Sequence, residues 1–122
     1  MRFFHISDLH FGKLLYGYDL TEEHRNFIEQ LGDYCDKYNP DAVLIAGDVY
    51  DRSVPSADAM TLLDELLNKL SGRKVFIISG NHDNAKRLSF GKDFLKKHDI
   101  YISTVPQTGE NEKIEKVTFA DE

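Results

Sequence analysis

Three short segments of the chain contain residue types that bind metal ions and transfer protons. In chain order they read Asp8-Leu9-His10, Gly47-Asp48-Val49-Tyr50-Asp51 and Gly80-Asn81-His82-Asp83. Each segment follows directly on a run of apolar residues of the kind that forms a strand. Carboxylate, imidazole and amide groups gathered in one place are typical of a divalent metal site. The repetition predicts a metal centre that acts on phosphate esters.

The first segment offers a carboxylate and an imidazole two positions apart. In an extended chain the side chains of Asp8 and His10 point to the same side, where both can bind one ion. Taken alone this spacing is a weak signal, and an ordinary pair of loop residues remains the alternative.

The second segment places an acidic residue directly after a fully apolar strand. Gly47 permits a sharp exit from the strand and a close approach of the backbone to an ion. The carboxylate of Asp48 can then bridge two ions, and Asp51 can orient a ligand from behind. The alternative is that both aspartates are turn and helix-capping residues.

The third segment is the most specific of the three. Asn81 offers a neutral amide oxygen to a metal, and His82 can supply a proton or stabilise charge on a phosphate. Asp83 is placed to orient the histidine ring and raise its basicity. Alone, the segment could be a plain turn, but its order after the other two favours the metal site.

Strand and helix patterns alternate along the chain and must position these segments. Strands are predicted over residues 2–6, 42–46, 74–78 and 100–102, with residues 42–46 apolar enough to be covered on both faces. Repeated strand–helix–strand units imply a parallel α/β sheet. Ligands of such sheets bind beyond the carboxyl ends of the strands, so one site can gather all three segments.

Three helices are expected between these strands. The first is capped by Thr21 and runs to about Tyr38, the second opens at Pro55 and Ser56 and closes at Ser71-Gly72, and the third lies around residues 86–97. The apolar stripes at helical spacing are predicted to be Phe27, Leu31, Tyr34 and Tyr38 on the first helix, and Met60, Leu63, Leu67 and Leu70 on the second.

The composition sets limits on the class of protein. The length of 122 residues fits one domain or a piece of one. No apolar run is long enough to cross a bilayer, and no signal peptide is recognisable, so a cytoplasmic protein without a membrane partner is expected. The net charge of −6 argues mildly against broad binding to nucleic acid, although bound cations would change that balance.

Several other residues are candidates for a role. Cys35 is the single cysteine and is expected to be a buried, inert thiol. His5, His24 and His98 are expected to be structural or solvated. Four basic residues flank the motifs and either contact DNA phosphates or are ordinary exposed side chains: Lys13, Arg52, Lys86 and Arg87.

The order Asp-x-His, Gly-Asp-x-x-Asp, Gly-Asn-His-Asp resembles that of the calcineurin-like metallophosphoesterase superfamily. The flanking residues are similar to those of its SbcD-type nuclease subunits, over about residues 1–105. They read Ser7-Asp8-Leu9-His10-Phe11-Gly12-Lys13, Leu15-Tyr16-Gly17, Ala46-Gly47-Asp48-Val49-Tyr50-Asp51-Arg52 with Pro55, and Gly80-Asn81-His82-Asp83 followed by Arg87-Leu88.

The resemblance implies a fold and a set of residue roles. The fold would be the N-terminal half of an α/β/β/α sandwich over residues 1–105, with residues 106–122 a polar segment leading on from it. Two divalent ions would be bound, most readily Mn²⁺, with Mg²⁺ or another divalent ion as alternatives. The implied ligands are Asp8 and His10 for the first ion, Asp48 for both, and Asn81 for the second. His82 would be the catalytic histidine, backed by Asp83.

The resemblance also implies an activity and partners. The family hydrolyses phosphodiester bonds by a two-metal mechanism, as an exonuclease on double-stranded DNA and an endonuclease on single strands and hairpins. It serves DNA repair, recombination and replication. Its partners are DNA, an SbcC-type ATPase subunit and a second copy of the nuclease. The alternatives are a related phosphoesterase for small phosphate substrates and a binding scaffold that has lost catalysis.

One departure from the family pattern limits these expectations. The second half of the family's domain brings further metal-binding histidines, whereas no histidine follows His98 here. The α/β pattern is therefore expected to be incomplete. Four ligand residues are few for two ions that each take about six donors. We expect the isolated chain to bind Mn²⁺ weakly, to show little or no nuclease activity, and to expose an apolar face.

Overall fold

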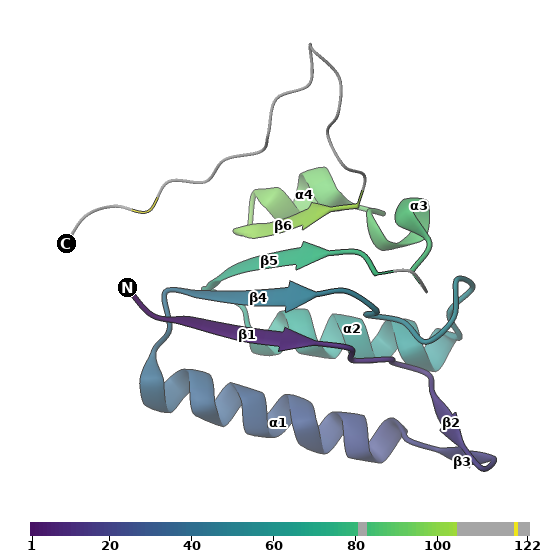
Figure 1. Cartoon of the computed structure of the whole chain (residues 1–122). Helices are drawn as coiled ribbons and strands as arrows, with labels where there is room; N and C mark the ends of the chain where they lie inside the picture. Colours follow the sequence, from purple (N-terminus) through teal and green to yellow (C-terminus); the bar gives the residue numbers. More distant parts are fainter. Residues whose placement is uncertain (81–82, 105–118, 120–122) are drawn as a thin grey trace.

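Four parallel strands form the central sheet of the computed structural model, which describes residues 1–80, 83–104 and 119. The sheet order is β1-β4-β5-β6, and all of its arrows point the same way (Figure 1). The bounds are β1 Phe3–Ser7, β4 Ala42–Ala46, β5 Lys74–Ile78 and β6 Ile100–Ser103. This confirms the predicted parallel α/β sheet. Most of the segment predicted over residues 106–122 lies outside the described residues.

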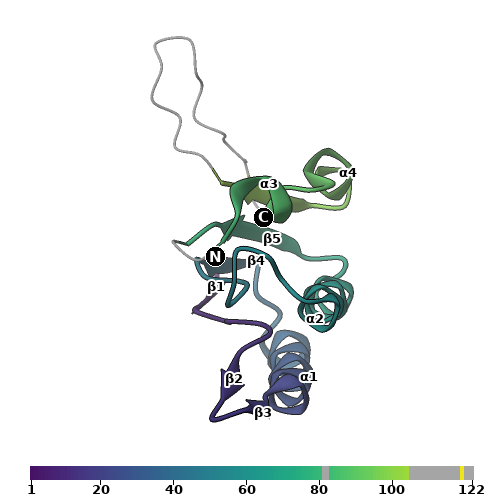
Figure 2. The same cartoon turned by 90° about the vertical axis from the view of Figure 1, so that its right-hand side faces the viewer.

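Helices connect the strands and cover one face of the sheet. They are α1 Thr21–Tyr38, α2 Ala57–Lys69, α3 Ala85–Leu88 and α4 Lys92–Lys96. Figure 2 shows α1, α2 and α4 on the same side of the sheet, with α3 beyond the carboxyl ends of the strands. Among the described residues, no helix combines the length and apolar character needed to cross a bilayer.

The first helix begins differently from the prediction. Thr21 is its first residue, and Leu20 occupies the capping position without a side-chain cap. Asp19 binds the first residue of the helix instead: its Oδ1 accepts hydrogen bonds from the backbone N–H of Thr21 at 2.8 Å and from the Thr21 hydroxyl. Since the Asp19 carboxylate lies at the positive end of the helix dipole, it also stabilises the start of α1.

The buried stripes of both long helices are rotated from the predicted ones. On α1 the buried residues are Ile28, Leu31, Gly32 and Cys35, while Tyr34 and Tyr38 are exposed and stack on each other. On α2 they are Ala59, Leu62, Leu63 and Leu66. Of the predicted stripe on this helix, Leu63 and Leu70 are buried and Leu67 packs against the core, whereas Met60 is exposed. The predictions missed the small residues Gly32 and Ala59, which face the core where elements pack closely. Lys69 of α2 lies so close to Gly32 that a Cβ there would be 2.3 Å from its Cε.

The starts of the later helices differ in how well they follow the prediction. Ser56 caps α2 as expected, with its Oγ accepting from the Ala59 N–H at 3.2 Å. The single helix predicted around residues 86–97 is wrong, because α3 and α4 are separate. Ser89 is the C-cap of α3, and Gly91, with a left-handed φ of 75°, is the N-cap of α4.

A short hairpin between the first strand and the first helix was not predicted. It pairs β2 Leu14–Leu15 with β3 Tyr18–Asp19. The two turn residues between them, Tyr16 and Gly17, both have positive φ, as a tight two-residue hairpin turn requires. Tyr16 is 96% exposed, so the tip of the hairpin stands clear of the core.

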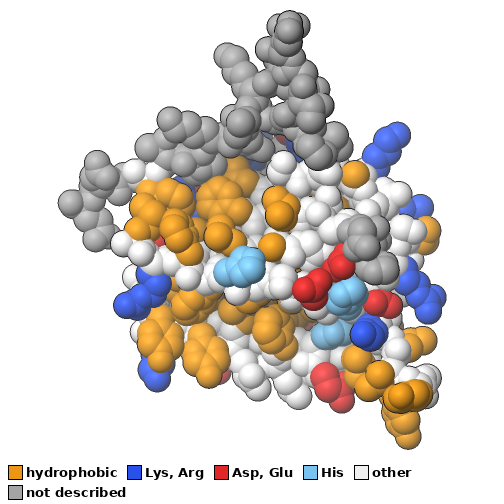
Figure 3. Space-filling view, in the orientation of Figure 1, with side chains coloured by type: hydrophobic (Ala, Val, Ile, Leu, Met, Phe, Trp, Pro, Cys, Tyr) orange, Lys and Arg blue, Asp and Glu red, His pale blue; other side chains and the backbone are white. Residues whose placement is uncertain are grey.

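The second face of the sheet carries no helix from the described ranges. Strand register places His5, Leu44, Phe76 and Tyr101 in one row across it. The rings of Phe76 and Tyr101 stack at 5.1 Å, and Phe119 packs against Phe76. Figure 3 shows hydrophobic side chains gathered on this side. The apolar face expected from the sequence is therefore present, and the helices of the described residues cover β4 on one face only (Figure 2).

Candidate metal centre

The three predicted segments meet at the carboxyl edge of the sheet, as three adjacent loops. Loop 1 (Asp8–His10) follows β1, loop 2 (Gly47–Asp51) follows β4 and loop 3 (Gly80–Asp83) follows β5. The His10 N–H donates to the Asp48 carbonyl at 2.9 Å, which links loop 1 to loop 2. The Gly47 N–H donates to the Ile78 carbonyl at 2.9 Å, which links loop 2 to the end of β5. Backbone hydrogen bonding thus continues past the strands and holds the loops in register.

Loops 1 and 2 bring three ligand-type side chains together. Asp8, His10 and Asp48 each offer an atom, and these atoms all lie within 4.8 Å of one another. The Nε2 atom of His10 is 3.8 Å from Asp8 Oδ1 and 3.8 Å from Asp48 Oδ2. Two atoms bound to one ion at about 2.1 Å can be at most about 4.2 Å apart, so both separations fit a shared ion. The residues present therefore fit a divalent metal.

All three members of this cluster have left-handed backbone conformations. The φ angles are 55° for Asp8, 49° for His10 and 47° for Asp48. Such conformations cost a non-glycine residue about 1 kcal/mol or more and tend to cluster at functional sites. Among residues other than glycine, aspartate, asparagine and histidine adopt them most often.

Asp51 fixes the ring of His10 from the other side. Its Oδ1 lies 3.1 Å from His10 Nδ1, while Nε2 faces Asp8 and Asp48. In the tautomer that carries hydrogen on Nδ1, Asp51 accepts this hydrogen and the Nε2 lone pair is left for a metal. Carboxylates commonly hold metal-binding histidines in this way. This geometry supports the ligand-orienting role predicted for Asp51 over a simple turn role.

Asp83 makes a set of contacts that the sequence did not suggest. Its Oδ2 accepts from the N–H groups of Val49 at 3.1 Å and Gly80 at 2.8 Å, and its Oδ1 accepts from the Tyr50 N–H at 2.9 Å. The carboxylate therefore joins loop 2 to loop 3. Burial, with a smaller effect of Asp83, raises the pKa of the Tyr50 phenol to about 12, which keeps it neutral.

Two glycines let loops 2 and 3 touch. A Cβ built on Gly80 would lie 2.3 Å from both the backbone nitrogen and Oδ1 of Asp48. A Cβ on Gly47 would lie 3.4 Å from the Gly80 Cα. Because Asp48 lies so close, only glycine fits at position 80 without a shift of the loops. The place of Gly80 in the third motif could have suggested a special role, but residue types alone do not define this contact.

Two of the predicted site residues, Asn81 and His82, lie outside the described residues. Of their neighbours, Gly80 lies against Asp48, and Asp83 accepts from the N–H groups of Val49 and Tyr50. The ligand role of Asn81 and the catalytic role of His82 stay predictions.

His24 supports loop 1 from α1. Its ring lies edge-on to the ring of Phe11, which directly follows His10, with the ring centroids 5.2 Å apart. Burial lowers the pKa of His24, so the imidazole is the neutral form at neutral pH. This agrees with the structural role expected for it. His5 and His98 are exposed, and Cys35 is buried, with a thiol pKa raised by that burial.

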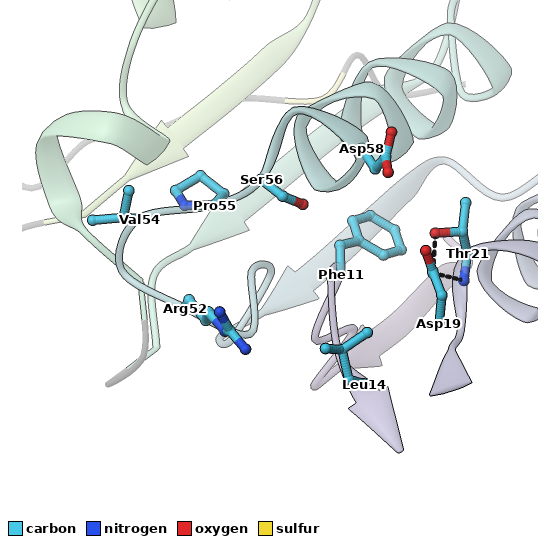
Figure 4. Close-up of a pocket in the computed structure, with 10 residues that line it drawn as sticks. Phe11, Leu14, Asp19, Thr21, Arg52, Val54, Pro55, Ser56 and Asp58 are labelled. Atoms are coloured by element: carbon cyan, nitrogen blue, oxygen red, sulfur yellow. Dashed lines mark hydrogen bonds between the residues drawn. The ribbon is translucent and has the colours of Figure 1, made fainter. Parts of the chain in front are cut away.

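The four flanking basic residues Lys13, Arg52, Lys86 and Arg87 are all exposed. Arg52 lines a pocket of about 440 Å³ beside loop 1, together with residues from the hairpin and the first turn of α2. Figure 4 shows Arg52 on the loop before α2, with Ser56 at the cap of that helix and Asp58 in its first turn. The wall also contains Asp19 and Asp58, so the pocket is not uniformly basic.

Comparisons with known proteins agree with this geometry. The model of the calcineurin-like phosphoesterase family matches residues 1–120. The chain is also 37% identical over 107 residues to SbcD, the D component of the SbcCD nuclease, of Staphylococcus epidermidis; the match covers 85% of this chain and 29% of that protein. The chain thus spans less than a third of the length of this curated relative. Its parallel sheet with helices on one face agrees with the N-terminal half of the sandwich expected from the resemblance. The chain belongs to the calcineurin-like phosphoesterase family.

Proposed function

We propose that this chain supplies part of the catalytic centre of a metal-dependent DNA nuclease that hydrolyses phosphodiester bonds in DNA repair and recombination. The observation that carries the proposal is the convergence of Asp8, His10 and Asp48 within 4.8 Å at the edge of the sheet. The similarity to a nuclease component supports DNA as the substrate. The proposed substrates are double-stranded ends for exonuclease action and single strands and hairpins for endonuclease action.

In the proposed site, Asp8 and His10 would hold one divalent ion, Asp48 would contribute to two, and Asn81 would hold the second. The two ions, proposed to be Mn²⁺, would supply an activated water and neutralise charge on the phosphate. Asp51 keeps His10 in the tautomer that presents Nε2. His82 would give a proton to the leaving oxygen or stabilise the charge that develops on the phosphate.

Metal binding by this chain is the first test. Titration with Mn²⁺, followed by calorimetry and by paramagnetic broadening of amide signals, is expected to show weak binding confined to loops 1, 2 and 3. Asp48→Asn should abolish the effect, and Asp33→Asn on the exposed side of α1 should leave it unchanged. Broadening spread over the whole acidic surface would contradict the assigned site.

Cleavage is the second test, with end-labelled duplex, single-stranded and hairpin DNA in the presence of Mn²⁺. The chain alone is expected to cut little, because the four ligand residues named here are few for two ions. In a longer protein that contains this segment, His82→Ala should abolish cleavage and spare DNA binding. Efficient cleavage by the chain alone, or an active His82→Ala protein, would overturn these roles. Release of phosphate from a small monoester without action on DNA would favour a small-substrate phosphoesterase.

DNA contacts are proposed for the exposed residues Lys13, Arg52, Lys86 and Arg87, which flank the three loops. Each residue that contacts a phosphate should reduce the slope of log affinity against log salt by about 1 when it is replaced by Gln. Fluorescence anisotropy with a labelled duplex at several salt concentrations measures this slope. Lys37→Gln on α1 serves as the control.

We also propose a homodimer built through the groove between α2 and the α3–α4 segment, and an SbcC-type ATPase as a further partner. The groove has a volume of about 760 Å³. Its lining includes Met60, Phe90 and Phe94, which are 54%, 86% and 66% exposed. Phe94→Glu should shift sedimentation toward the monomer, whereas Tyr34→Glu on α1 should not. A protein that is monomeric at all concentrations would contradict this surface.

A further inference from the structure

The carboxylate of Asp83 receives an unusual number of backbone hydrogen bonds for a side chain next to a proposed catalytic residue. Three N–H groups, from Val49, Tyr50 and Gly80, converge on its two oxygens at 2.8–3.1 Å. Hydrogen bonds to an ionised acceptor are roughly twice as strong as those between neutral groups. Three such bonds to one carboxylate hold the backbone of loops 2 and 3 in place more firmly than the local hydrogen bonds of an ordinary turn aspartate would.

The conformation of loop 2 explains why the loop needs this support. Gly47 and Asp48 both have left-handed backbones, with φ of 80° and 47°. The N–H groups of the next two residues, Val49 and Tyr50, both donate to the Asp83 carboxylate, so this turn forms a concave anion site of the kind known as a nest. The structure fills this nest with the Asp83 carboxylate, so loop 3 supplies the counter-charge that stabilises the strained loop 2.

The third bond closes the connection on loop 3. The Gly80 N–H donates to the same Oδ2 that binds Val49. Gly80 is also the residue whose missing Cβ makes room for Asp48. One carboxylate therefore fixes the backbone that lies against both the nitrogen and the carboxylate of Asp48.

We propose that Asp83 is a positioning residue that joins loop 2 to loop 3 and thereby fixes Asp48 for metal binding. The claim that Asp83 serves metal binding rests on the proposed function. The claim that Asp83 holds loops 2 and 3 together rests on the hydrogen bonds alone. It extends the role suggested by the sequence, in which Asp83 only orients His82. The carboxylate acts on the ligand set through the backbone of Asp48 and does not touch the reacting atoms.

Asp83→Asn is the most informative variant because it keeps the shape of the side chain. An amide has one acceptor oxygen, so its NH₂ group must face at least one backbone N–H. Either orientation loses at least one of the three bonds and places two donors together. Asp33→Asn, an exposed residue on α1, is the matched control for the loss of one charge.

Amide hydrogen exchange measured by NMR tests the mechanics without any metal. In Asp83→Asn, protection of the Val49, Tyr50 and Gly80 amides should fall about 10- to 100-fold, as expected for lost hydrogen bonds to a charged acceptor. The amides of Val43 and Ile45 in β4 should keep their protection, and the amide signals of His10 and Asp48 should shift. A uniform loss over β4 and β5 would indicate a general stabilising role and overturn the proposal, as would unchanged protection.

Mn²⁺ binding tests whether Asp83 supports the metal site. The concentration of Mn²⁺ that half-broadens the loop 1 signals should rise about 10- to 100-fold in Asp83→Asn, the range found for residues that support metal ligands. Asp33→Asn should match the wild type. Unchanged Mn²⁺ affinity together with lost protection would overturn the positioning role. If the wild-type chain itself does not respond to Mn²⁺, the proposed metal site fails, and the exchange data and the His10 and Asp48 shifts still decide whether Asp83 fixes loop 2.

Discussion

The two ends of the same four strands use left-handed residues for different purposes. At the amino ends, Asn39, Gly72 and Asp99 have φ of 44°, 86° and 65° and lie in the turns that follow helices. The Asn39 N–H, for example, donates to the Cys35 carbonyl at 2.8 Å and closes the last turn of α1. At the carboxyl ends the same conformation occurs at Asp8, His10 and Asp48.

The side chains show what separates the two ends. At the amino ends Asn39 and Asp99 are each paired with a cation: Asn39 accepts from Arg73 at 3.1 Å, and Asp99 lies 3.2 Å from Lys74. At the carboxyl ends two carboxylates face one imidazole nitrogen. The amino ends are arranged for stability, whereas the carboxyl ends hold like charges close together, an arrangement that a cation would stabilise.

Asp48→Gly should give the largest contrast between the two ends. Glycine relieves the left-handed strain and removes one of two neighbouring carboxylates, so the free energy of unfolding should stay within about 1 kcal/mol of the wild type or rise. Mn²⁺ affinity should fall by more than about 100-fold, beyond the loss caused by a supporting residue. Urea unfolding and Mn²⁺ broadening measure the two quantities. Asn39→Gly should leave Mn²⁺ binding intact; a parallel loss there would erase the distinction.

Gly80→Ala should give the next largest effect. The added Cβ would lie 2.3 Å from the Asp48 nitrogen, so the loops must separate. We expect a stability loss of about 1–3 kcal/mol, as for overpacking, and Mn²⁺ binding more than about tenfold weaker. Gly72→Ala at the amino end meets no atom within 4 Å. It should cost only about 1 kcal/mol of backbone strain and leave Mn²⁺ binding unchanged. Equal effects of the two substitutions would argue against the close contact of loops 2 and 3.

Asp51→Asn should have a smaller effect, confined to the metal site. The amide still accepts a hydrogen bond from His10 Nδ1, but it stabilises the metal-binding tautomer less than a carboxylate does. We expect Mn²⁺ affinity to fall about tenfold, with little change in the urea midpoint. At the amino ends, the Asp41 carboxylate accepts from the backbone N–H of Arg2 at 2.7 Å. Asp41→Asn should therefore show the reverse pattern, a small loss of stability and no change in Mn²⁺ affinity.

The smallest expected effect concerns pH. The pKa of His24 is lowered by burial, so the unfolded chain binds a proton more readily than the folded one. The contribution of neutral His24 to stability is thus present above the unfolded pKa of about 6.5 and is lost as the pH falls below it. Urea unfolding at about pH 7.5 and about pH 5.5 should show a smaller drop for His24→Gln than for the wild type. An identical drop would show that His24 does not carry this dependence.

Much of the fold followed from the sequence because its signals are local. The apolar runs at 42–46 and 74–78 matched β4 and β5 in both bounds, and Ser56 caps α2 as its type suggested. The helix stripes were misjudged because burial depends on how closely neighbouring elements approach. Gly32 is buried against Lys69 of another helix, and helical spacing cannot reveal that contact.

In the candidate site, too, the sequence revealed local features but not the contacts between separate loops. Residue types predicted Asp8, His10 and Asp48 as ligands, because carboxylates and imidazoles bind divalent metals and ligands bind beyond the carboxyl ends of parallel strands; the structure brings these three side chains together. The partners of Asp83 could not be found in this way, because they are backbone N–H groups of another loop, which every residue type except proline provides. The short hairpin was missed because its strands have only two residues each, too few for a periodic pattern.

The register of β1 on β4 has a consequence for how the chain folds. Ser7 pairs with Ala46, across 38 intervening residues, so Asp8 and Asp48 meet only after this long-range pairing forms. Contacts of such high sequence separation form slowly. A slip by one residue would turn Phe4 and Ile6 outward and carry His10 away from Asp48. A divalent ion that binds these residues would therefore select the correctly paired chain during folding, and added Mn²⁺ should stabilise the native register over shifted ones.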